Sequence, residues 1–243
     1  MGERRPRKPS AAAAGGAAKP SRGQRGWSRA RRPEQKRQRR ATILEAAIEL
    51  LDEGGLEAAS LSEIARRSKI SKANLYRYFE SREAILLAVS LDELEAWLDA
   101  LTTRVETIAE GPVGSRLEAI ADAVVETLLA RPRVSVLVAS LSSVLEHNVG
   151  TAVVIEFKRS LHALTGAPTE ALARAAPGLG VDGARTFMTF VFVSVAGVHP
   201  VANPAPAVAE VLADPEFAEM CVEFAPFVRA HALTVLRGLL ASP

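Results

Sequence analysis

The sequence predicts an all-α fold, and two observations lead to that prediction. Apolar residues recur at three- and four-residue spacing from about residue 42 onwards, which is the period of helices with one buried face. No stretch shows the alternation of apolar and polar residues, closed by a tight turn, that is typical of a β-hairpin. With 243 residues and 48% hydrophobic content, the chain is long enough to bury a sizeable core.

The first segment, residues 1–32, differs from the rest in composition. It consists mainly of Arg, Lys, Pro, Gly, Ser and Ala, with Trp27 as its one aromatic residue. Such a segment cannot bury enough surface to offset its ordering entropy, so we predict a disordered basic tail. Its role has two readings. It is a solvated tail that aids solubility, or an arm that adds nonspecific DNA affinity or enters the minor groove.

The formal charge of +2 hides a division along the chain. Residues 1–40 hold fourteen Lys or Arg against two Glu, which leaves a formal charge of −10 on the remainder. A basic end suits a polyanion, because each Lys or Arg that neutralises a phosphate releases condensed counterions. The acidic remainder argues against nucleic acid touching the rest of the molecule.

A helix-turn-helix is predicted for residues 33–81. In "ATILEAAIELLDEGG" the apolar residues share one helix face, and the glycine pair at the end of this stretch stops the helix. Ser60 and Glu63 stand at capping-box spacing at the start of a short helix, and Ser71 offers an N-cap for the next one. Two short helices joined by a tight turn, after a longer helix, form this motif.

The last of these helices, within "SKISKANLYRYFESREAI", has two different faces. A rotation of about 100° per residue places Leu75 and Phe79 inward, with Tyr76 at the flank. The outward residues are Lys72, Ala73, Asn74 and Arg77. In a major groove, basic side chains can contact guanine or phosphate, an amide can pair with adenine, and a methyl group can touch thymine. The alternative is an ordinary solvated face.

Residues 42–86, "ILEAAIELLDEGGLEAASLSEIARRSKISKANLYRYFESREAIL" with the residue before it, resemble the DNA-binding domain of the TetR family of transcriptional regulators. The resemblance implies base contacts for Ser62, Lys72, Ala73 and Tyr76, contacts to bases or backbone for Asn74 and Tyr78, and a phosphate contact for Arg82. The full predicted DNA-binding set is Ser60, Ser62, Lys69, Lys72, Ala73, Asn74, Tyr76, Arg77, Tyr78 and Arg82.

One position departs from the family pattern. The turn between the two short helices usually carries Gly, where this chain has Lys69. A residue with a Cβ costs about 1 kcal/mol in a left-handed conformation. We therefore expect a slightly distorted turn, or a lysine that recovers energy at a nearby phosphate.

Helices are expected to continue beyond this domain, over residues 82–108, 114–130, 133–147, 150–165, 168–176, 181–198 and 207–240. Proline and glycine mark the breaks between them. The resemblance implies that residues 82–243 form a variable helical domain that dimerises and binds a small effector. The apolar run "FMTFVFVSVAGV" is shorter than the roughly 18 residues of a membrane span, so we interpret it as a buried helix and expect no membrane contact.

Two sets of residues are candidates within this larger domain. A helix that is apolar all round must be covered on all sides, either by the chain's own helices or by a second copy. The expected homodimer interface is Phe187, Phe190, Val191, Ser194, Phe224, Val228, His231 and Val235. Polar residues within apolar helices mark candidate effector contacts, namely Ser140, Ser143, His147, His162 and Thr189. Their surroundings suggest a largely hydrophobic effector.

An enzyme is the competing class of protein. Ser143, Glu146 and His147 share one helical face in "SSVLEH", but no glycine-rich elbow supplies an oxyanion hole. The histidines and Cys221 have no metal-ligand spacing, and a phosphate-binding glycine loop is missing. We therefore expect no catalytic residues, no metal and no cofactor.

The sequence thus predicts a cytoplasmic, sequence-specific regulator of transcription, more specifically a repressor. A single cysteine and the lack of an export signal favour the cytoplasm. The expected partners are double-stranded DNA with a near-palindromic operator, a small-molecule effector and a second copy of the chain. The alternative function is a nucleoid-type architectural DNA-binding protein.

Overall fold

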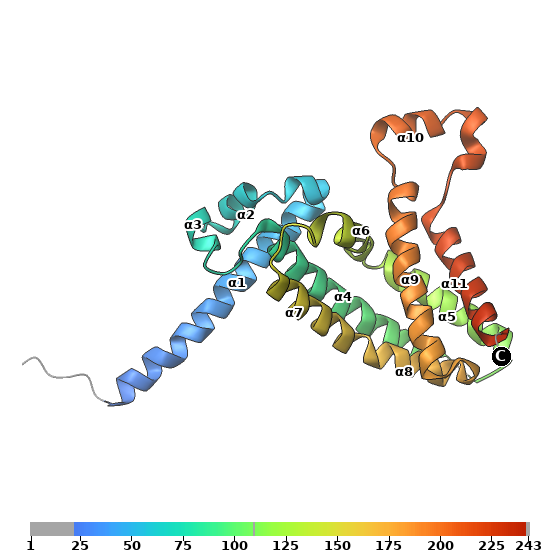
Figure 1. The fold of residues 1–243 in the computed structure, drawn as a ribbon, viewed down its shortest axis with the longest axis horizontal. Helices are drawn as coiled ribbons and strands as arrows, with labels where there is room; N and C mark the ends of the chain where they lie inside the picture. Colours follow the sequence, from blue (N-terminus) through green and yellow to red (C-terminus); the bar gives the residue numbers. More distant parts are fainter. Residues whose placement is uncertain (1–21, 109, 242–243) are drawn as a thin grey trace, which may run out of the picture. The chain divides into compact units, whose positions relative to one another are not determined.

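The computed structural model describes residues 22–108 and 110–241, with side chains described from residue 34 onwards (Figure 1). Contacts divide the chain into residues 1–40 and residues 41–243, and each unit is considered by itself. Every regular element in the described ranges is helical, which confirms the predicted all-α class. The core lies in the second unit.

Three helices make up the predicted DNA-binding region: α1 (Arg22–Ala58), α2 (Leu61–Ser68) and α3 (Lys72–Leu75). The first begins inside the segment predicted as a tail, and the part of that tail before Arg22 lies outside the described residues. The start of α1 holds Arg, Gln and Ala, which are good helix formers, together with Gly23 and Gly26, which are poor ones. The helix is bent at Gly54 and Gly55, where φ of Gly55 is 66°.

The rest of the chain is helical as well. Its elements are α4 (Arg82–Glu106), α5 (Val113–Leu129), α6 (Pro132–Ser140), the π-turn η1 (Leu141–Leu145), α7 (Thr151–Leu164), α8 (Gly166–Ala175), η2 (Pro177–Leu179), α9 (Gly180–Ala202), α10 (Pro206–Leu212), η3 (Pro215–Met220) and α11 (Phe224–Ala241).

The single helix predicted over 207–240 is wrong, because three elements occupy this range. Pro215 lacks the N–H that a continuing helix needs, and the Asp214 carboxylate accepts a hydrogen bond from the Glu216 N–H at 2.9 Å, which starts a new turn. Neither α10 nor η3 buries a residue. Together they form an arm, residues 203–223, that extends away from the ends of α9 and α11 (Figure 1).

A continuous core joins the helices of the larger domain. Helix α9 packs on α6, α8 and α11, while α4 packs on α5, α6, α7 and α8. Trp97 of α4 lies at the centre of this core and is 1% exposed. Its indole N–H donates to Thr127 Oγ1 at 3.1 Å, and the edge of one ring faces Phe192 of α9 with centroids 5.5 Å apart. Because α4 begins directly after α3, this packing connects the larger domain with the DNA-binding region.

Helix α9 needs a separate comment because of its length. By length and composition alone, the segment Pro177–Ala202 could cross a membrane, and so could the bent pair of α5 with α6 and η1. One or two such helices are weak evidence, since core helices of soluble proteins pass the same test. Six side chains of α9 are buried among the helices of this chain, but only 33% of its most apolar window is buried, so the helix predicted as buried is only partly covered.

Candidate DNA-binding surface and effector groove

Serine caps fix where the helices of the DNA-binding region begin. The Ser60 hydroxyl accepts a hydrogen bond from the Glu63 N–H at 3.2 Å, and the Ser71 hydroxyl accepts one from the Asn74 N–H at 3.4 Å. Such caps contribute about 1 kcal/mol each. Ser60, predicted as a DNA contact, is therefore first the N-cap of α2. The cap at Ser71 sets Lys72 as the first residue of α3.

The turn between α2 and α3 contains a left-handed residue at the position where the family pattern usually has Gly. Lys69 has φ 56° and ψ 32°, in the left-handed region, and is the one positive-φ residue other than glycine in the described part of the chain. The Ile70 N–H donates to the Ala65 carbonyl at 3.1 Å and closes the end of α2. The lysine side chain is exposed, so it is free to reach a phosphate.

We expect Lys69→Gly to raise the free energy of unfolding by about 0.5–1 kcal/mol, because glycine carries no steric penalty at positive φ. Urea unfolding followed by circular dichroism measures this change. The matched control is Arg66→Gly, inside the regular part of α2, where glycine should destabilise by about 1 kcal/mol. Equal losses at both positions would show that the turn is unstrained.

The predicted reading face of α3 is open to solvent. Lys72, Ala73 and Asn74 of α3 are exposed, as are its C-cap Tyr76, the following Arg77 and Ser62 of α2. Tyr76 is 57% exposed, so its ring and hydroxyl are open to a partner. Leu75 and Phe79 are buried, and Tyr78 is half-buried against the core. The division of the aromatic residues thus follows the helical periodicity.

Arg82 requires a correction. Its guanidinium was expected at a phosphate, but its Nε–H donates to the Ala59 carbonyl at 2.8 Å and a second N–H donates to the Leu56 carbonyl. A third nitrogen lies 3.4 Å from the Glu83 carboxylate. The end of α1 leaves these carbonyls without intrahelical partners, and Arg82 satisfies them. The side chain therefore fixes the start of α4 against the end of α1.

Helix α2 is held to α1 by an ion-pair cluster. The Arg67 guanidinium reaches Glu53 at 2.6 Å and Glu49 at 3.0 Å. The hydrogen bond from Arg67 lowers the pKa of Glu53, and the hydrogen bonds to Glu53 and Glu49 raise the pKa of Arg67. The two carboxylates stand one helical turn apart, so a single arginine fork spans both. The cluster orients α2, and with it the turn that presents α3.

Two polar ties connect the DNA-binding region with the larger domain. The Arg133 guanidinium, at the start of α6, lies 3.0 Å from both Asp52 carboxylate oxygens and 2.8 Å from Glu93. Burial alone would lower the pKa of Arg133, but its hydrogen bonds to Asp52 and Glu93 outweigh burial and leave that pKa raised. At the start of α7, the Gly150 N–H donates to the Glu80 carboxylate at 2.5 Å.

Of the five predicted effector contacts, two lie together. His162 and Thr189 both line a groove of about 360 Å³ between α7, α8 and α9. The complete lining is Lys158, Leu161, His162, Thr165, Thr169, Arg185, Met188, Thr189, Phe192 and Val193. A volume of this size falls within the usual range for small-molecule sites.

The other three candidates lie elsewhere. Ser140 is buried, and its hydroxyl donates to the Val136 carbonyl at 2.8 Å within its own helix. Helix α6 then changes to the π-turn η1, and Ser143 and His147 are exposed. The π-turn alters the rotation per residue, so the face predicted from regular spacing is not maintained. Glu146 pairs with Lys158 at 2.6 Å, so the Ser143, Glu146 and His147 constellation of a hydrolase is not assembled.

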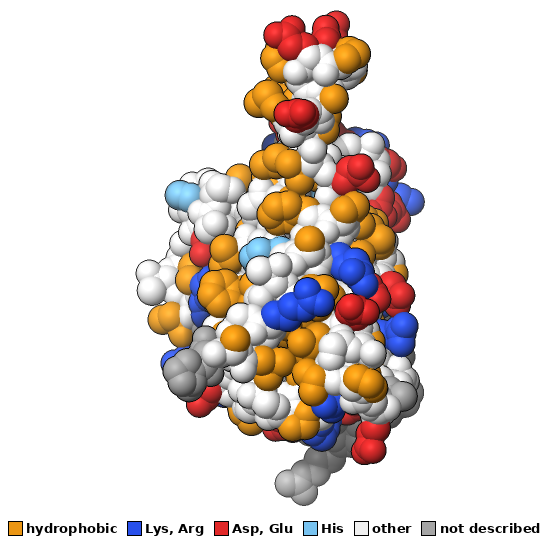
Figure 2. Space-filling model, turned by 90° about the vertical axis from the view of Figure 1, so that its right-hand side faces the viewer, with side chains coloured by type: hydrophobic (Ala, Val, Ile, Leu, Met, Phe, Trp, Pro, Cys, Tyr) orange, Lys and Arg blue, Asp and Glu red, His pale blue; other side chains and the backbone are white. Residues whose placement is uncertain are grey.

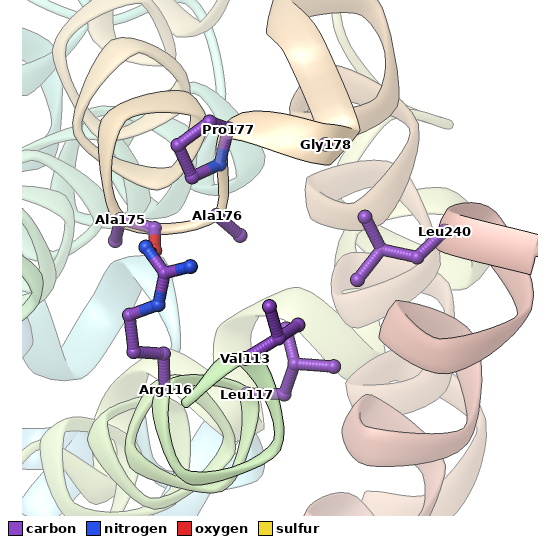
Figure 3. Close-up of a pocket in the computed structure, with 8 residues that line it drawn as sticks. All are labelled: Val113, Arg116, Leu117, Ala175, Ala176, Pro177, Gly178 and Leu240. Carbon is purple, nitrogen blue, oxygen red and sulfur yellow. The ribbon is translucent and has the colours of Figure 1, made fainter. Parts of the chain in front are cut away.

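A second, smaller cavity lies between α5, η2 and the end of α11 (Figure 3). It measures about 70 Å³, and Arg116 donates to the Ala175 carbonyl at 3.2 Å across one side. The Nε of Arg116 is buried without a partner. Leu240, Val113 and Leu117 supply apolar walls (Figure 3). Ordered water can satisfy one nitrogen in a space of this size, so the larger groove is the better candidate for an effector.

The predicted dimer surface is partly inside the chain. Phe187, Val191 and Val228 are buried by the chain's own helices, so a second copy does not reach them. Ser194, Phe224, His231 and Val235 are half-buried, while Phe190 is 45% exposed. In a helix that is apolar all round, periodicity does not show which face turns inward, and this is the physical reason for the error.

Other apolar side chains of the same two helices are exposed. They are Phe190 and Val201 of α9 and Phe227 of α11, whereas Val193, exposed as well, lines the groove. The side of the molecule that includes α11 shows several apolar patches (Figure 2). The sequence signal was that Phe190 and Val201 stand about three helical turns apart, a spacing that returns to the same helix face. We call Phe190, Val201 and Phe227 the apolar stripe.

No group of three or more His, Cys, Asp or Glu residues that could hold a metal ion occurs within the described ranges. Cys221 is exposed and unpaired by a disulfide. The described surface of the DNA-binding region carries exposed cationic, amide and aromatic side chains.

An exposed reading helix on a helix-turn-helix, joined to a larger helical domain with a groove, defines a DNA-binding regulatory protein. Residues 43–89 match the family model for bacterial regulatory proteins of the tetR family, and residues 91–243 match that for the tetracyclin repressor-like C-terminal domain. The chain belongs to the TetR family of transcriptional regulators.

Individual proteins agree with this assignment. The chain is 31% identical over 84 residues to an HTH-type transcriptional regulator BetI from Escherichia coli, which covers 35% of this chain and 43% of that protein. The chain thus spans less than half the length of the curated relatives it matches. A TetR transcriptional regulator from a Rhodococcus species superposes with a TM-score of 0.52 at 20% identity, covering 86% of this chain and 98% of that one. The latter similarity concerns the fold alone.

Proposed function

We propose that this chain is a homodimeric repressor that binds a near-palindromic operator through α3 and leaves it when a small effector binds. The observation that carries the proposal is the exposed face of α3. Its cationic, amide and phenolic groups lie outside the core, on a short helix whose start is fixed by the cap at Ser71. N-terminal residues of such a helix reach base edges when it lies in the major groove.

Contacts to DNA divide into two kinds on this surface. Lys72 and Arg77 carry charge, which strengthens hydrogen bonds to phosphate or guanine. Asn74 and Tyr76 can read base edges, while Lys69 in the turn suits a phosphate. Because phosphate contacts position the protein and base contacts specify the sequence, the surface has the components of a sequence-specific reader.

Dimerisation is supported by the apolar stripe on α9 and α11. Its three large apolar side chains lie in water unless something covers them, and exposed apolar groups of this kind are typical of association surfaces. A second copy covers the stripe through a two-fold axis, because the same surface then serves both partners. Two reading helices would then lie about 34 Å apart, or a multiple of that distance.

The proposed route from effector to DNA uses α4 and its neighbours. Arg82 joins the start of α4 to the end of α1, and Arg133 and Glu80 tie the DNA-binding region to α6 and α7. A displacement of α4 or α7 therefore changes the orientation of α3. By linkage, operator DNA must weaken effector binding by the same factor as the effector weakens operator binding.

Selection of bound sequences from random duplex DNA tests the proposed function. We expect a palindrome for the full chain, loss of definition at one position per half-site with Arg77→Ala, and the same palindrome with residues 1–32 deleted. The truncated chain should show a shallower dependence of affinity on salt, since fewer counterions are released. A chain that enriches no sequence, yet still coats DNA, would instead be a nucleoid-type architectural protein.

A further inference from the structure

We propose that the groove between α7, α8 and α9 binds an amphiphile with an apolar body and one anionic head group. This inference rests on the proposed effector-responsive function and names the chemical class of the effector. Its basis is the combination of an apolar floor with cations on opposite sides of the groove.

The floor of the groove is apolar. Leu161 of α7 faces Met188 and Phe192 of α9 across it, with Val193 at the same side. Met188 is buried, Leu161 and Phe192 are half-buried, and Val193 is 65% exposed. A ligand that covers these side chains removes apolar surface from water, which favours binding by about 25 cal/mol per Å². The body of the ligand is therefore apolar.

The charged lining has one sign. Lys158 and Arg185 stand on α7 and α9, and no Asp or Glu lines the groove. This is unusual in a chain whose residues beyond 40 carry a formal charge of −10. Glu146 and Asp182 pair with these cations at 2.6 and 2.8 Å from outside the groove. The pair of Arg185 with Asp182 is solvent-exposed and contributes at most about 1 kcal/mol, so an anionic head group can replace Asp182. Glu146 is 22% exposed, so the head group shares Lys158 with it.

The threonine hydroxyl groups of the lining are not available as hydrogen-bond donors to a ligand. Thr165, Thr169 and Thr189 each donate their hydroxyl hydrogen to a backbone carbonyl one turn earlier. Their oxygens therefore accept hydrogen bonds and offer no donor to an anion. An anionic head group must then take its donors from Lys158 and Arg185, with His162 beside them.

Contacts through α4 and α7 connect the groove with the DNA-binding region. Phe192 in its floor contacts Trp97 of α4 edge to face, and α4 is the next helix after α3 along the chain. Helix α7 carries Lys158 near its middle, and its first N–H groups lie beside Gly150, which donates to Glu80. A ligand that moves Phe192 or α7 thus acts on both connections.

Fluorescence of Trp97 measures binding directly. Trp27→Phe leaves Trp97 as the sole tryptophan, since the chain has two. Four probes with alkyl chains of nine or ten carbons, decanoate, decyl phosphate, decanol and decyltrimethylammonium, are titrated below their micelle-forming concentrations. We expect decanoate or decyl phosphate to bind at least tenfold more tightly than decanol, as measured by the change in Trp97 emission. We expect decyltrimethylammonium not to bind. The stronger of the two anions identifies the head group.

Three variants locate the site. The double variant Lys158→Gln with Arg185→Gln should weaken binding of the anionic probe at least tenfold and leave the binding of decanol unchanged. Thr189→Trp places a bulky side chain at an exposed position and should weaken the binding of every probe by filling the groove. Because this variant adds a tryptophan, its binding is measured by displacement of a dansylated alkyl probe. The matched control is Arg174→Gln, an exposed cation on α8 outside the groove, which should bind as the parent does.

Decanol or the alkylammonium binding as tightly as the anions would overturn the anionic class. Unchanged binding to Thr189→Trp, or equal loss with Arg174→Gln, would overturn the site. Anion binding that leaves operator affinity unchanged would remove the effector role. Failure of the proposed function is a separate result, because it appears as the loss of sequence selection by ligand-free protein.

Discussion

Replacing Tyr76 by alanine is expected to lower operator affinity about ten- to a hundredfold, the cost of about 1–3 kcal/mol for a lost base contact. The free energy of unfolding should change little, because the ring is largely in solvent and serves no part of the core. Fluorescence anisotropy with the selected operator, at fixed salt, measures the affinity, and urea unfolding measures the stability.

Tyr78→Ala supplies the matched control for this aromatic pair. Tyr78 is half-buried against the core, so its truncation should cost stability through lost packing. Tyr76→Phe separates ring from hydroxyl, since it keeps the ring and removes one hydrogen-bonding group. Operator affinity that is unchanged in Tyr76→Ala would remove this residue from the reading surface.

The DNA-binding region was predictable because its signals are local. Ser60 with Glu63, and Ser71 with the helix after it, determine where short helices begin within a few residues of sequence. The left-handed conformation of Lys69 occurs at the turn position where the resemblance to the TetR family implies a glycine. Rotation about the helix axis then separates Leu75 and Phe79 from the exposed side chains.

The position of Arg82 could not be predicted in the same way. Its acceptors are the carbonyls of Leu56 and Ala59, which are available only because α1 bends at its glycine pair and then ends. That arrangement depends on how α4 packs against α1, across more than twenty residues of chain. A cationic side chain at the start of a helix near DNA gives no sequence signal that separates an inward contact from a phosphate contact.

The larger domain was predictable in class and less so in detail. In α9, apolar side chains occur on every side, so the sequence did not distinguish Phe187, which is buried, from Phe190, which is exposed. The π-turn η1 shifts Ser143 and His147 out of the expected face. His162 and Thr189 line one groove because α7 and α9 both border it, which the spacing within either helix does not show.

The polar tie at Arg133 gives the second large prediction, a stability loss of about 2–3 kcal/mol for Arg133→Met. Glu93, only 7% exposed, would lose its close partner and keep Arg131 alone, at 3.9 Å. Breaking a buried ion pair by removing one partner typically costs about 3–5 kcal/mol, and the partial exposure of Arg133 reduces this figure. Urea unfolding with a fixed slope measures the change.

A double-mutant cycle decides whether the loss comes from the stranded carboxylate. Glu93→Gln added to Arg133→Met should restore part of the stability, because the buried group is then neutral. Arg131→Met, at the longer distance, should cost less than about 1 kcal/mol. If Arg133→Met were as stable as the parent chain, or if Glu93→Gln restored nothing, the pair would not hold the two regions together. Transmission from the groove to α3 would then depend on α4 and on the contact between Glu80 and Gly150.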